Sequence, residues 1–160
     1  MPKLSEALDT SIKALLIKGR KNYLCKTRFD WFISDRNTIG VDDIESVIPI
    51  LFWLHYTRSG DLSECNGFFN SRKTWIVSMI CSDTGFCTGN ICSKNHGCFY
   101  GSIRKQMYEA DILVANHSLL LSEAKVPGIL PEHDTIIIDE AHNLVKGGYD
   151  QFKISLDYNS

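Results

Sequence analysis

The sequence predicts an α/β fold built on a parallel sheet, and three observations support this prediction. A run of β-branched residues at 135–138 is typical of a strand that is buried on both faces of such a sheet. Asp139 and Glu140 follow this run, at the edge where open α/β sheets bind their ligands. A second strand is expected at 111–115, directly after a helix at 102–110.

The two carboxylates have the chemistry that a nucleotide hydrolase needs at a strand end. An aspartate there holds Mg²⁺, usually through water, and a neighbouring glutamate orients or activates the attacking water. The alternative is a strand that ends in an acidic helix cap, because both residue types favour a helix N-terminus. The isoleucines before the pair, and Ala141 and His142 after it, favour the hydrolase motif.

The composition is that of an ordinary globular domain, with 160 residues, 44% hydrophobic residues and a net charge of −2. Residues 17–28 nevertheless contain five cations and no anion, which suits either a local phosphate-binding stripe or a solvated basic face. The longest apolar stretch, Val47 to Leu54, is too short to span a bilayer, so no membrane partner and a cytoplasmic location are expected.

Six cysteines in a reducing compartment favour metal or cluster binding over disulfides. The last four lie within eighteen residues, in a loop with too little apolar content to fold by burial alone. Zinc sites usually combine two tight cysteine pairs, and only Cys87 and Cys92 are that close. The spacing Cys87-x₄-Cys92-x₅-Cys98 is loose, which suits a larger cluster. Zinc and an iron–sulfur cluster both remain open from spacing alone.

Helical patterns are expected elsewhere. Residues 4–17 form an amphipathic pattern, and residues 43–57 form a second one that is interrupted by Pro49. Ile44, Val47, Ile48, Leu51 and Leu54 are expected to form the buried face of the second helix. Residues 75–80 fit a strand or a helix, residues 125–133 fit a surface connection, and no pattern is evident after Lys146.

Together these segments resemble the iron–sulfur helicases of superfamily 2, most closely the bacterial DinG type, which is related to the xeroderma pigmentosum group D family. The order Asp139-Glu140-Ala141-His142 is the name-giving motif of a helicase group in that superfamily. Six landmarks occur in the family order: Lys18 to Cys25, Trp53 with Thr57 and Ser59 to Glu64, Cys87 to Phe99, Ala110 to Leu120, Leu130-Pro131 and Ile137 to Leu144.

The resemblance implies a RecA-like helicase motor domain with an inserted iron–sulfur domain made mostly of helices and loops. The expected divisions are the end of a first motor segment at 1–24, the cluster domain at 25–105, the continued motor domain at 106–145 and the start of an arch-like insertion at 146–160. Cys25, Cys87, Cys92 and Cys98 would hold a 4Fe-4S cluster, whereas Cys65 and Cys81 have no counterpart and are expected to be free thiols.

The resemblance also implies ATP, Mg²⁺ and DNA as ligands of a monomeric enzyme. Asp139 would position Mg²⁺, Glu140 would align water and His142 would couple the nucleotide state to DNA. Nucleic-acid contacts are expected at Arg20, Lys21 and Arg104, and near Asn116 and His117, although Asn116 could instead cap its own turn.

A phosphate-binding Gly-x₄-Gly-Lys-Ser/Thr loop is missing from the sequence, so this chain is expected to be part of an ATP-dependent DNA helicase and inactive alone. The alternative is a non-catalytic nucleic-acid-binding module that is stabilised by zinc or by a cluster.

Overall fold

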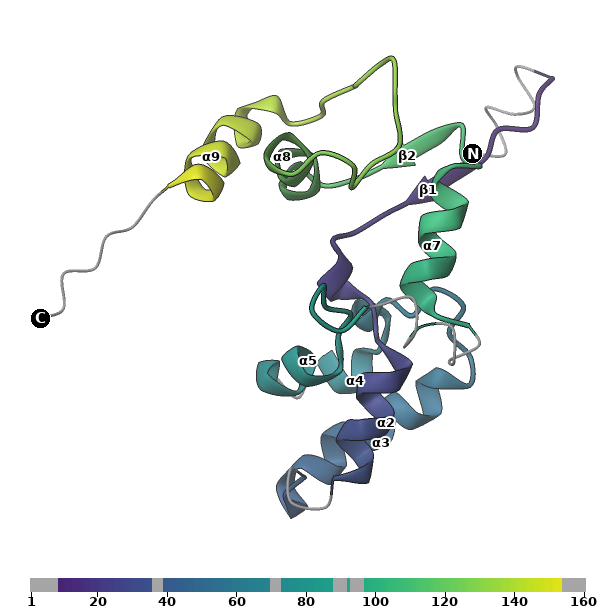
Figure 1. Ribbon diagram of the computed structural model, residues 1–160, viewed down its shortest axis with the longest axis vertical. Helices are drawn as coiled ribbons and strands as arrows, with labels where there is room; N and C mark the ends of the chain where they lie inside the picture. Colours follow the sequence, from purple (N-terminus) through teal and green to yellow (C-terminus); the bar gives the residue numbers. More distant parts are fainter. Residues whose placement is uncertain (1–8, 36–38, 70–72, 88–91, 93–96, 154–160) are drawn as a thin grey trace, which may run out of the picture. The chain divides into compact units, whose positions relative to one another are not determined.

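The structure is a computed structural model that describes residues 9–35, 39–69, 73–87, 92 and 97–153. The chain divides into two compact units (Figure 1). The strand unit comprises Met1–Lys18 and Met107–Ser160, and the cysteine unit comprises Gly19–Gln106. The elements in chain order are β1 (Ala14–Leu16), η1 (Arg20–Asn22), α2 (Lys26–Ser34), α3 (Val41–Leu54), η2 (Leu62–Glu64), α4 (Asn66–Phe69), α5 (Thr74–Ile80), α7 (Phe99–Met107), β2 (Ile112–Val114), α8 (His117–Lys125) and α9 (Ala141–Phe152).

The sheet of the strand unit consists of β1 and β2, which pair in parallel with Ala14 opposite Ile112. The pairing extends past β1, because the N–H of Ile17 donates to the carbonyl of Val114 at 2.8 Å. A parallel pair needs a long crossover between its strands. Here the connection from β1 to β2 is the whole cysteine unit, which is therefore inserted in the sequence between two strands that pair with each other.

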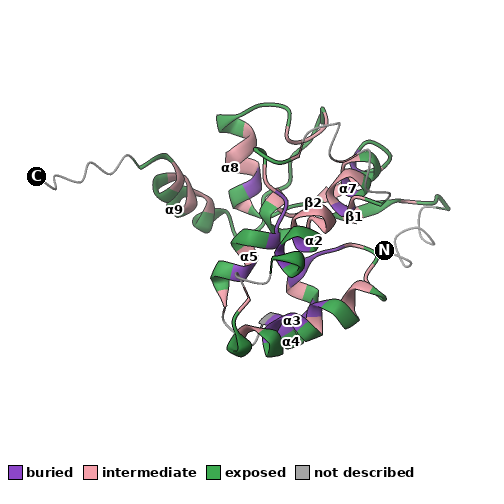
Figure 2. Cartoon of the chain, turned by 60° about the horizontal axis from the view of Figure 1, so that its bottom comes forward, coloured by how far each residue is buried: buried purple, intermediate pink, exposed green. Residues whose placement is uncertain are grey.

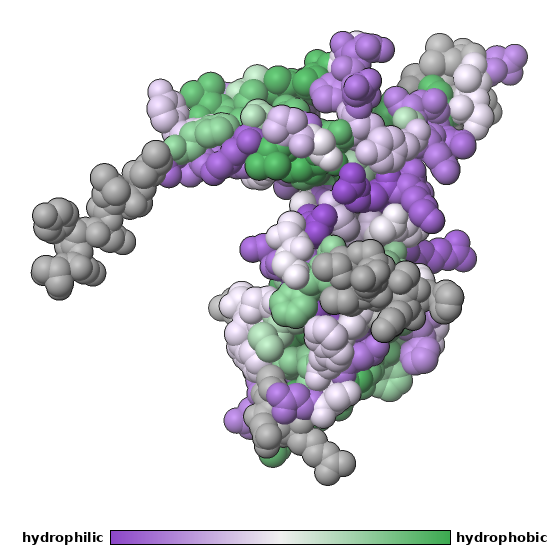
Figure 3. All heavy atoms as spheres, viewed as in Figure 1, coloured by the Kyte–Doolittle hydropathy of each residue, from purple (hydrophilic) through white to green (hydrophobic). Residues whose placement is uncertain are grey.

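Helices α8 and α9 pack against each other in the strand unit (Figure 1). The amide of Gln151 donates to the hydroxyl of Ser122 at 2.8 Å across their contact. The strand unit still exposes apolar side chains, and Figure 3 shows such atoms on its surface. Val145, Tyr149 and Phe152 recur at helical spacing along α9 and are each more than half exposed.

Glu123 of α8 organises the turn that follows this helix. Its carboxylate accepts hydrogen bonds from the backbone N–H groups of Gly128, Ile129 and Leu130 at 2.7–2.8 Å. These donors hold the pKa of the Glu123 carboxyl below its usual value, since they stabilise the charged form. Gly128 has φ +95°, a conformation that favours glycine.

The core of the described chain lies in the cysteine unit, where α2 packs on α5 and α3 packs on α4. Figure 2 shows buried positions concentrated among these helices. The core combines large apolar side chains with two thiols: Leu24, Phe29, Phe32, Val47, Ile50, Leu62, Cys65, Phe68, Ile76, Ile80, Cys81 and Phe99. Burial of apolar surface on this scale stabilises the unit.

An extended backbone segment at Tyr23 and Leu24 connects three parts of the cysteine unit. Leu24 donates to the carbonyl of Gly60 at 2.9 Å, and Ser82 donates to the carbonyl of Tyr23 at 2.8 Å. The next residue, Cys25, donates to the carbonyl of Ile80 at 2.8 Å. Antiparallel bridges therefore join Tyr23 to Asp61 and Leu24 to Cys81.

The segment at 57–64 is a tight turn that is held by its own side chains. Thr57 accepts from the N–H of Gly60 at 2.9 Å, and Ser59 donates to the carboxylate of Glu64 at 2.6 Å. Buried Asp61 accepts from both the N–H and the hydroxyl of Ser63. The polar residues of this landmark thus satisfy one another, which explains its composition in structural terms.

The amphipathic helix expected at 4–17 is wrong over its described part, residues 9–17, which contain no helix and form β1 at 14–16. Residues 4–8 lie outside the described residues. The leucines of this segment favour a helix locally, but pairing with β2 gives their backbone groups partners in a sheet. A tertiary partner therefore overrides the local periodicity.

The strand expected at 135–138 is absent from the described structure, where this segment is extended but unpaired as a strand. Ile137 is 92% exposed, although its sequence context predicts burial on both faces. Strand formation requires a neighbouring strand, and β1 and β2 pair only with each other. The prediction of a buried strand is therefore not met in this chain by itself.

Helix α3 agrees with the predicted helix at 43–57, but it begins at Val41 and ends at Leu54. The predicted buried face is correct only in part, because Val47 is buried and Leu54 packs partly buried against the core. Ile44, Ile48 and Leu51 are instead more than 40% exposed, and Ile50, outside the predicted face, is buried. Pro49 packs so closely on Gly67 that a Cβ at Gly67 would lie 2.9 Å from the proline ring. This contact turns the helix face toward α4.

The other element expectations are resolved as follows. Residues 75–80 are helical as part of α5, and the helix expected at 102–110 is α7, which begins at Phe99. The strand at 111–115 is confirmed as β2. The stretch after Lys146, where no pattern was expected, continues α9 to Phe152. Within the described residues, no helix is both long and apolar enough to cross a membrane.

We expect Gly60→Ala to lower the free energy of unfolding of the cysteine unit by about 3 kcal/mol. Gly60 has φ +67°, and an added Cβ would lie 2.2 Å from the ring of Phe99. The three tryptophans, Trp31, Trp53 and Trp75, all belong to this unit, so their fluorescence during urea unfolding reports on it alone. Gly19→Ala is the matched control, because its Cβ would meet only a side-chain nitrogen at 3.6 Å. Equal stability of both variants would contradict this account.

The turn at 128–130 should weaken at acidic pH. The lowered pKa of Glu123 means that its bonds stabilise the fold above the ordinary carboxyl pKa and are lost as pH falls through the lowered pKa. In an NMR titration, the amide shifts of Gly128, Ile129 and Leu130 should share one midpoint below pH 4.5. Glu123→Gln should abolish this shared transition, whereas a midpoint at or above 4.5 would refute the assignment.

Candidate functional site

Two of the four predicted ligand cysteines lie at the N-termini of helices. Cys25 is the N-cap residue of α2, and Cys98 directly precedes α7. The sulfur of Cys98 accepts a hydrogen bond from the N–H of Gly101 at 3.4 Å. The free N–H groups of a first helical turn favour negative charge, so these positions suit thiolates.

Cys87 ends a short turn that begins at Asp83. The N–H groups of Phe86 and Cys87 both donate to the carbonyl of Asp83, at 3.2 and 3.0 Å. The carboxylate of Asp83 accepts from the N–H of Gly85 at 3.0 Å. The backbone before Cys87 is therefore fixed by local hydrogen bonds.

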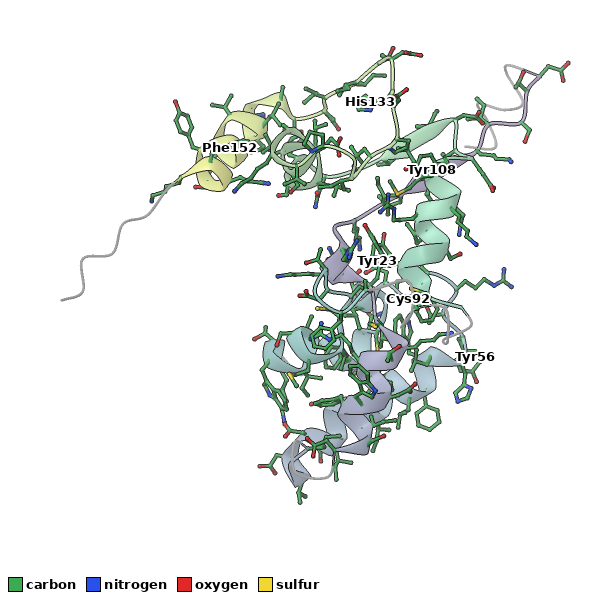
Figure 4. All side chains as sticks on the ribbon, viewed as in Figure 1. Tyr23, Tyr56, Cys92, Tyr108, His133 and Phe152 are labelled. Carbon is green, nitrogen blue, oxygen red and sulfur yellow. The ribbon has the colours of Figure 1, made fainter. Side chains whose placement is uncertain are left out.

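Three of the thiols act on the fourth. The pKa of the Cys92 thiol is raised to about 11, first by burial and then by the charges of Cys98, Cys87 and Cys25 and a hydrogen bond with Cys87. Cys92 is labelled in Figure 4, where it lies in the cysteine unit near the start of α7. Cysteines separated by up to seventy-three positions in the sequence thus lie within electrostatic reach of one another.

Among the described residues, no group of three or more His, Cys, Asp or Glu side chains is arranged to hold a metal ion. This absence is compatible with the effect of the other thiols on the pKa of Cys92, because the two observations report on different distances between sulfur atoms. The sulfurs around one tetrahedral zinc lie about 4 Å apart, given Zn–S bonds of ~2.3 Å, whereas charges act over longer distances. The donor set itself, four thiols with two at helix N-termini, fits the Cys₄ ligation of an iron–sulfur cluster.

Cys65 and Cys81 are different from the other four thiols. Each is only 3% exposed and packs in the apolar core, and burial raises the pKa of both thiols. Neither is among the groups that shift the pKa of Cys92. Their environment suits free, inert thiols, which is how the sequence analysis interprets them. His96, in the cysteine loop, lies outside the described residues.

The basic stretch at 17–28 is used largely inside the cysteine unit. The guanidinium of Arg20 lies 4.6 Å from the centre of the Tyr100 ring, which also packs against Tyr23. Lys21 is exposed, and Arg104 on α7 is half-buried. Arg20 and Lys21 are therefore neighbours in η1 with different surroundings, one on an aromatic ring and the other in solvent.

The carboxylates Asp139 and Glu140 are exposed and precede α9 in the strand unit. The side chain of Asp139 accepts from the N–H of Glu140 at 2.8 Å. Glu140 occupies the N-cap position with φ 49°, but its carboxylate faces His142, 3.3 Å away, and does not cap the helix. The acidic-cap alternative therefore accounts for the position of Glu140 but leaves its carboxylate available.

Asn116 and His117 lie at the start of α8. The side chain of Asn116 accepts from the N–H of Leu119 at 2.9 Å, so it caps the helix as the alternative interpretation holds. His117 reaches further along the chain, since its Nε2 lies 2.9 Å from the carbonyl oxygen of Asp139. The structure thus links the segment after β2 to the carboxylate motif.

The contacts of Gly60, Lys26, Arg28 and Phe86 were not predicted from the sequence. Lys26 lies 4.6 Å from the centre of the Phe99 ring, and Arg28 lies 4.7 Å from that of Phe86. Both rings are direct sequence neighbours of predicted ligand cysteines, namely Cys98 and Cys87. An aromatic residue beside each of these cysteines is the only signal in the sequence, and it does not identify the cation that packs on it.

Comparison with known proteins identifies several relatives. The family model DEAD_2 matches residues 67–160. The chain is 32% identical to the ATP-dependent DNA helicase YoaA of Escherichia coli K12 over 149 residues, which is 90% of this chain and 23% of that protein. YoaA of Haemophilus influenzae is 33% identical over 153 residues, and the 3'-5' exonuclease DinG of Bacillus subtilis is 28% identical over 144 residues.

The matched part is a minor share of each relative. The alignment with the Haemophilus protein includes 90% of this chain but only 23% of that relative. The alignment with the Bacillus protein includes 89% of this chain and 15% of that relative. No solved structure matches the chain. The resemblance inferred from the sequence motifs, to DinG-type helicases over part of their length, is confirmed.

We expect the six thiols of the reduced, metal-free chain to separate into two groups during alkylation with iodoacetamide. Cys65 and Cys81 should react only on unfolding, because they are 3% exposed and burial raises their pKa. Cys25, Cys87 and Cys98 should react in the folded chain, and Cys92 more slowly, since its pKa of about 11 leaves little thiolate.

The rates can be measured by peptide mass spectrometry, with circular dichroism to show that the chain stays folded. All six thiols should react alike in denaturant, which controls for intrinsic reactivity. Fast alkylation of Cys81 in the folded chain would remove the distinction between core thiols and ligands.

Proposed function

The chain belongs to the DEAD_2 family, and on that basis we propose that it forms part of the first motor domain of an ATP-dependent DNA helicase with a 4Fe-4S cluster domain. The observation that supports this most directly is that Cys25, Cys87 and Cys98, from distant parts of the cysteine unit, all lie near enough to Cys92 to act on its thiol. In the same chain, carboxylates suited to Mg²⁺ follow in the strand unit. A cluster site and a nucleotide site within one α/β framework are the combination that the sequence motifs imply.

Cys25, Cys87, Cys92 and Cys98 would hold the cluster. Bound iron would stabilise the thiolate of Cys92, which burial and then the charges of the other three thiols disfavour in its absence. The ligands come from the start of α2, from the turn after Asp83 and from the segment before α7. Joining them would tie a loop-rich insertion into a rigid body, as expected for a part that contacts DNA at a fork.

Asp139 would bind Mg²⁺ together with the ATP phosphates, and Glu140 would align the attacking water. His142 is close enough to Glu140 to respond to changes there, which suits a role in coupling nucleotide state to DNA. The exposed isoleucines before the motif support a further proposal: in the whole protein, residues 135–138 pair with strands of the motor that this chain does not contain.

Arg20, Lys21 and Arg104 are the proposed phosphate contacts, and all three belong to the cysteine unit. Such contacts bind the nucleic-acid backbone without sequence preference. His117 and Asn116 would lie near the DNA path, and the contact between His117 and the Asp139 carbonyl supports a link from that region to the nucleotide. The chain alone would bind without turnover, because the sequence has no phosphate-binding loop.

We propose that the cysteine unit, Gly19–Gln106, corresponds to the cluster domain expected at 25–105, and the strand unit to the motor segments. At the C-terminal side, the expected cluster domain ends at residue 105 and the cysteine unit ends at Gln106, a difference of one residue. The boundary near the N-terminus lies earlier, because η1 and the bridge at Tyr23 pack within the cysteine unit.

Anaerobically purified chain should contain about four iron atoms and four sulfides per polypeptide, with charge-transfer absorption in the visible range. Iron, acid-labile sulfide and zinc analysis measure this directly. Stoichiometric zinc without iron would show a zinc module instead, and a chain without metal would overturn the proposed centre.

Cys87→Ala and Cys92→Ala should each remove most of the iron, because a cubane with three protein ligands is exposed to exchange and loss. Cys65→Ala is the matched control: it removes a thiol of the same unit that lies in the core. It should retain the iron even if it lowers stability. Equal iron loss in all three variants would mean that the effect reports on folding and not on ligation.

A further inference from the structure

Helix α2 contacts three of the four segments that contain the proposed ligands. It begins at Cys25, so its N-terminus presents one thiol. From the same helix, Lys26 and Arg28 extend to rings that directly neighbour Cys98 and Cys87. The relative positions of these cysteines therefore depend on side chains that are not ligands themselves.

Arg28 is the more firmly held of the two cations. Its guanidinium donates to the carbonyl of Cys81 and to the carbonyl of Ser78, both at 2.7 Å. These carbonyls belong to the C-terminal end of α5, which favours a cation. Because two charge-assisted hydrogen bonds fix it, the guanidinium is a rigid platform for whatever packs on it.

Phe86 packs on that platform. Its ring centre is 4.7 Å from the Arg28 guanidinium carbon, and Trp31 of α2 meets it edge-on at 6.0 Å between ring centres. The ring is nevertheless 43% exposed, so burial alone does not hold it in place. The cation and the tryptophan edge supply the attraction that orients it.

Cys87 directly follows Phe86, and both backbone N–H groups bond to the same carbonyl, that of Asp83. Phe86 and Cys87 therefore belong to one hydrogen-bonded turn, and a Phe86 ring that is held against α2 restrains this turn beside the helix. On the other side of α2, Lys26 lies 3.1 Å from where a Cβ of Gly97 would stand and 4.6 Å from the centre of the Phe99 ring. Lys26 is therefore close to the residues on both sides of Cys98.

We propose that Arg28 is a positioning residue for the cysteine centre: by holding Phe86 against α2, it keeps the Cys87 thiol within reach of the Cys25 thiol. This inference rests on the proposed function, since it assigns a role toward the proposed cluster. Lys26 acts in the same way on Cys98 through Phe99. The two cations of α2 thus serve the ligand geometry and are not available as free phosphate contacts.

The test measures how fast iron leaves the anaerobically loaded full chain when it is mixed with a strong chelator, followed by loss of visible absorption. Phe86→Leu should speed release about two- to fivefold, the effect of losing a cation–ring contact. Phe86→Tyr keeps the ring and should restore the original rate. Arg28→Gln should speed release by more than Phe86→Leu, because it also removes hydrogen bonds to two carbonyls.

The double variant Arg28→Gln with Phe86→Leu should release iron no faster than Arg28→Gln alone, since both substitutions break the same chain of contacts. Arg58→Gln, at an exposed arginine of the same unit, is the matched control and should leave the rate unchanged. If Arg28→Gln fails to fold, the pair Phe86→Leu and Phe86→Tyr still decides the question.

Release rates of Phe86→Leu and Phe86→Tyr that equal that of the unsubstituted chain would overturn the positioning role while leaving the cluster assignment intact. A chain that binds zinc in place of iron would refute the cluster assignment, and zinc release from the same variants would then test the positioning of Cys87. A chain that binds neither metal would overturn both proposals.

Discussion

The backbone of Tyr23 and Leu24 bonds on one side to Gly60 and on the other to Ser82, and the rest of the cysteine unit depends on this arrangement. These few hydrogen bonds join segments that lie far apart in the sequence. They place Cys25 at the start of α2, beside the end of α5. They also bring Gly60 against Phe99, so that no larger residue fits at that turn. Cys25 and the segment next to Cys98, the first and last of the proposed ligands, are thereby both connected to this backbone segment.

The charges of the cysteine unit follow from the same arrangement. Four thiols gathered in one place concentrate potential negative charge. The pKa of Cys92 is raised mainly by burial, and the charges of Cys98, Cys87 and Cys25 contribute in the same direction. Cations close to these segments oppose this concentration of negative charge. Lys26 and Arg28 lie on rings beside the cysteines, and helix N-termini face Cys25 and Cys98. The basic stretch that resembles a phosphate-binding stripe in the sequence is therefore partly a support for the thiols.

In the strand unit, by contrast, the predicted site residues Asp139 and Glu140 follow apolar side chains that are exposed. Two strands form a pair, while the isoleucines before Asp139 stay exposed. Since the chain spans about a quarter or less of its relatives, the exposed surface is consistent with a partner that lies in the remaining part of such proteins. The contact between His117 and the Asp139 carbonyl is present in this chain, so this part of the motif's local geometry forms without such a partner.

The sequence by itself determined which residues are chemically special: the spaced cysteines, the Asp139-Glu140 pair, the polar turn at 57–64 and the helices at α3 and α7. These are properties of residue type and short spacing, which local chemistry fixes. Only the tertiary structure decided that residues 14–16 form a strand, that Ile48 faces solvent, and that Arg28 holds Phe86. Each of these features depends on a partner that is distant in the chain. For residues 14–16 the partner is β2, for Ile48 it is α4, whose Gly67 packs on Pro49, and for Arg28 it is the turn after Asp83. No local sequence pattern identifies such a partner.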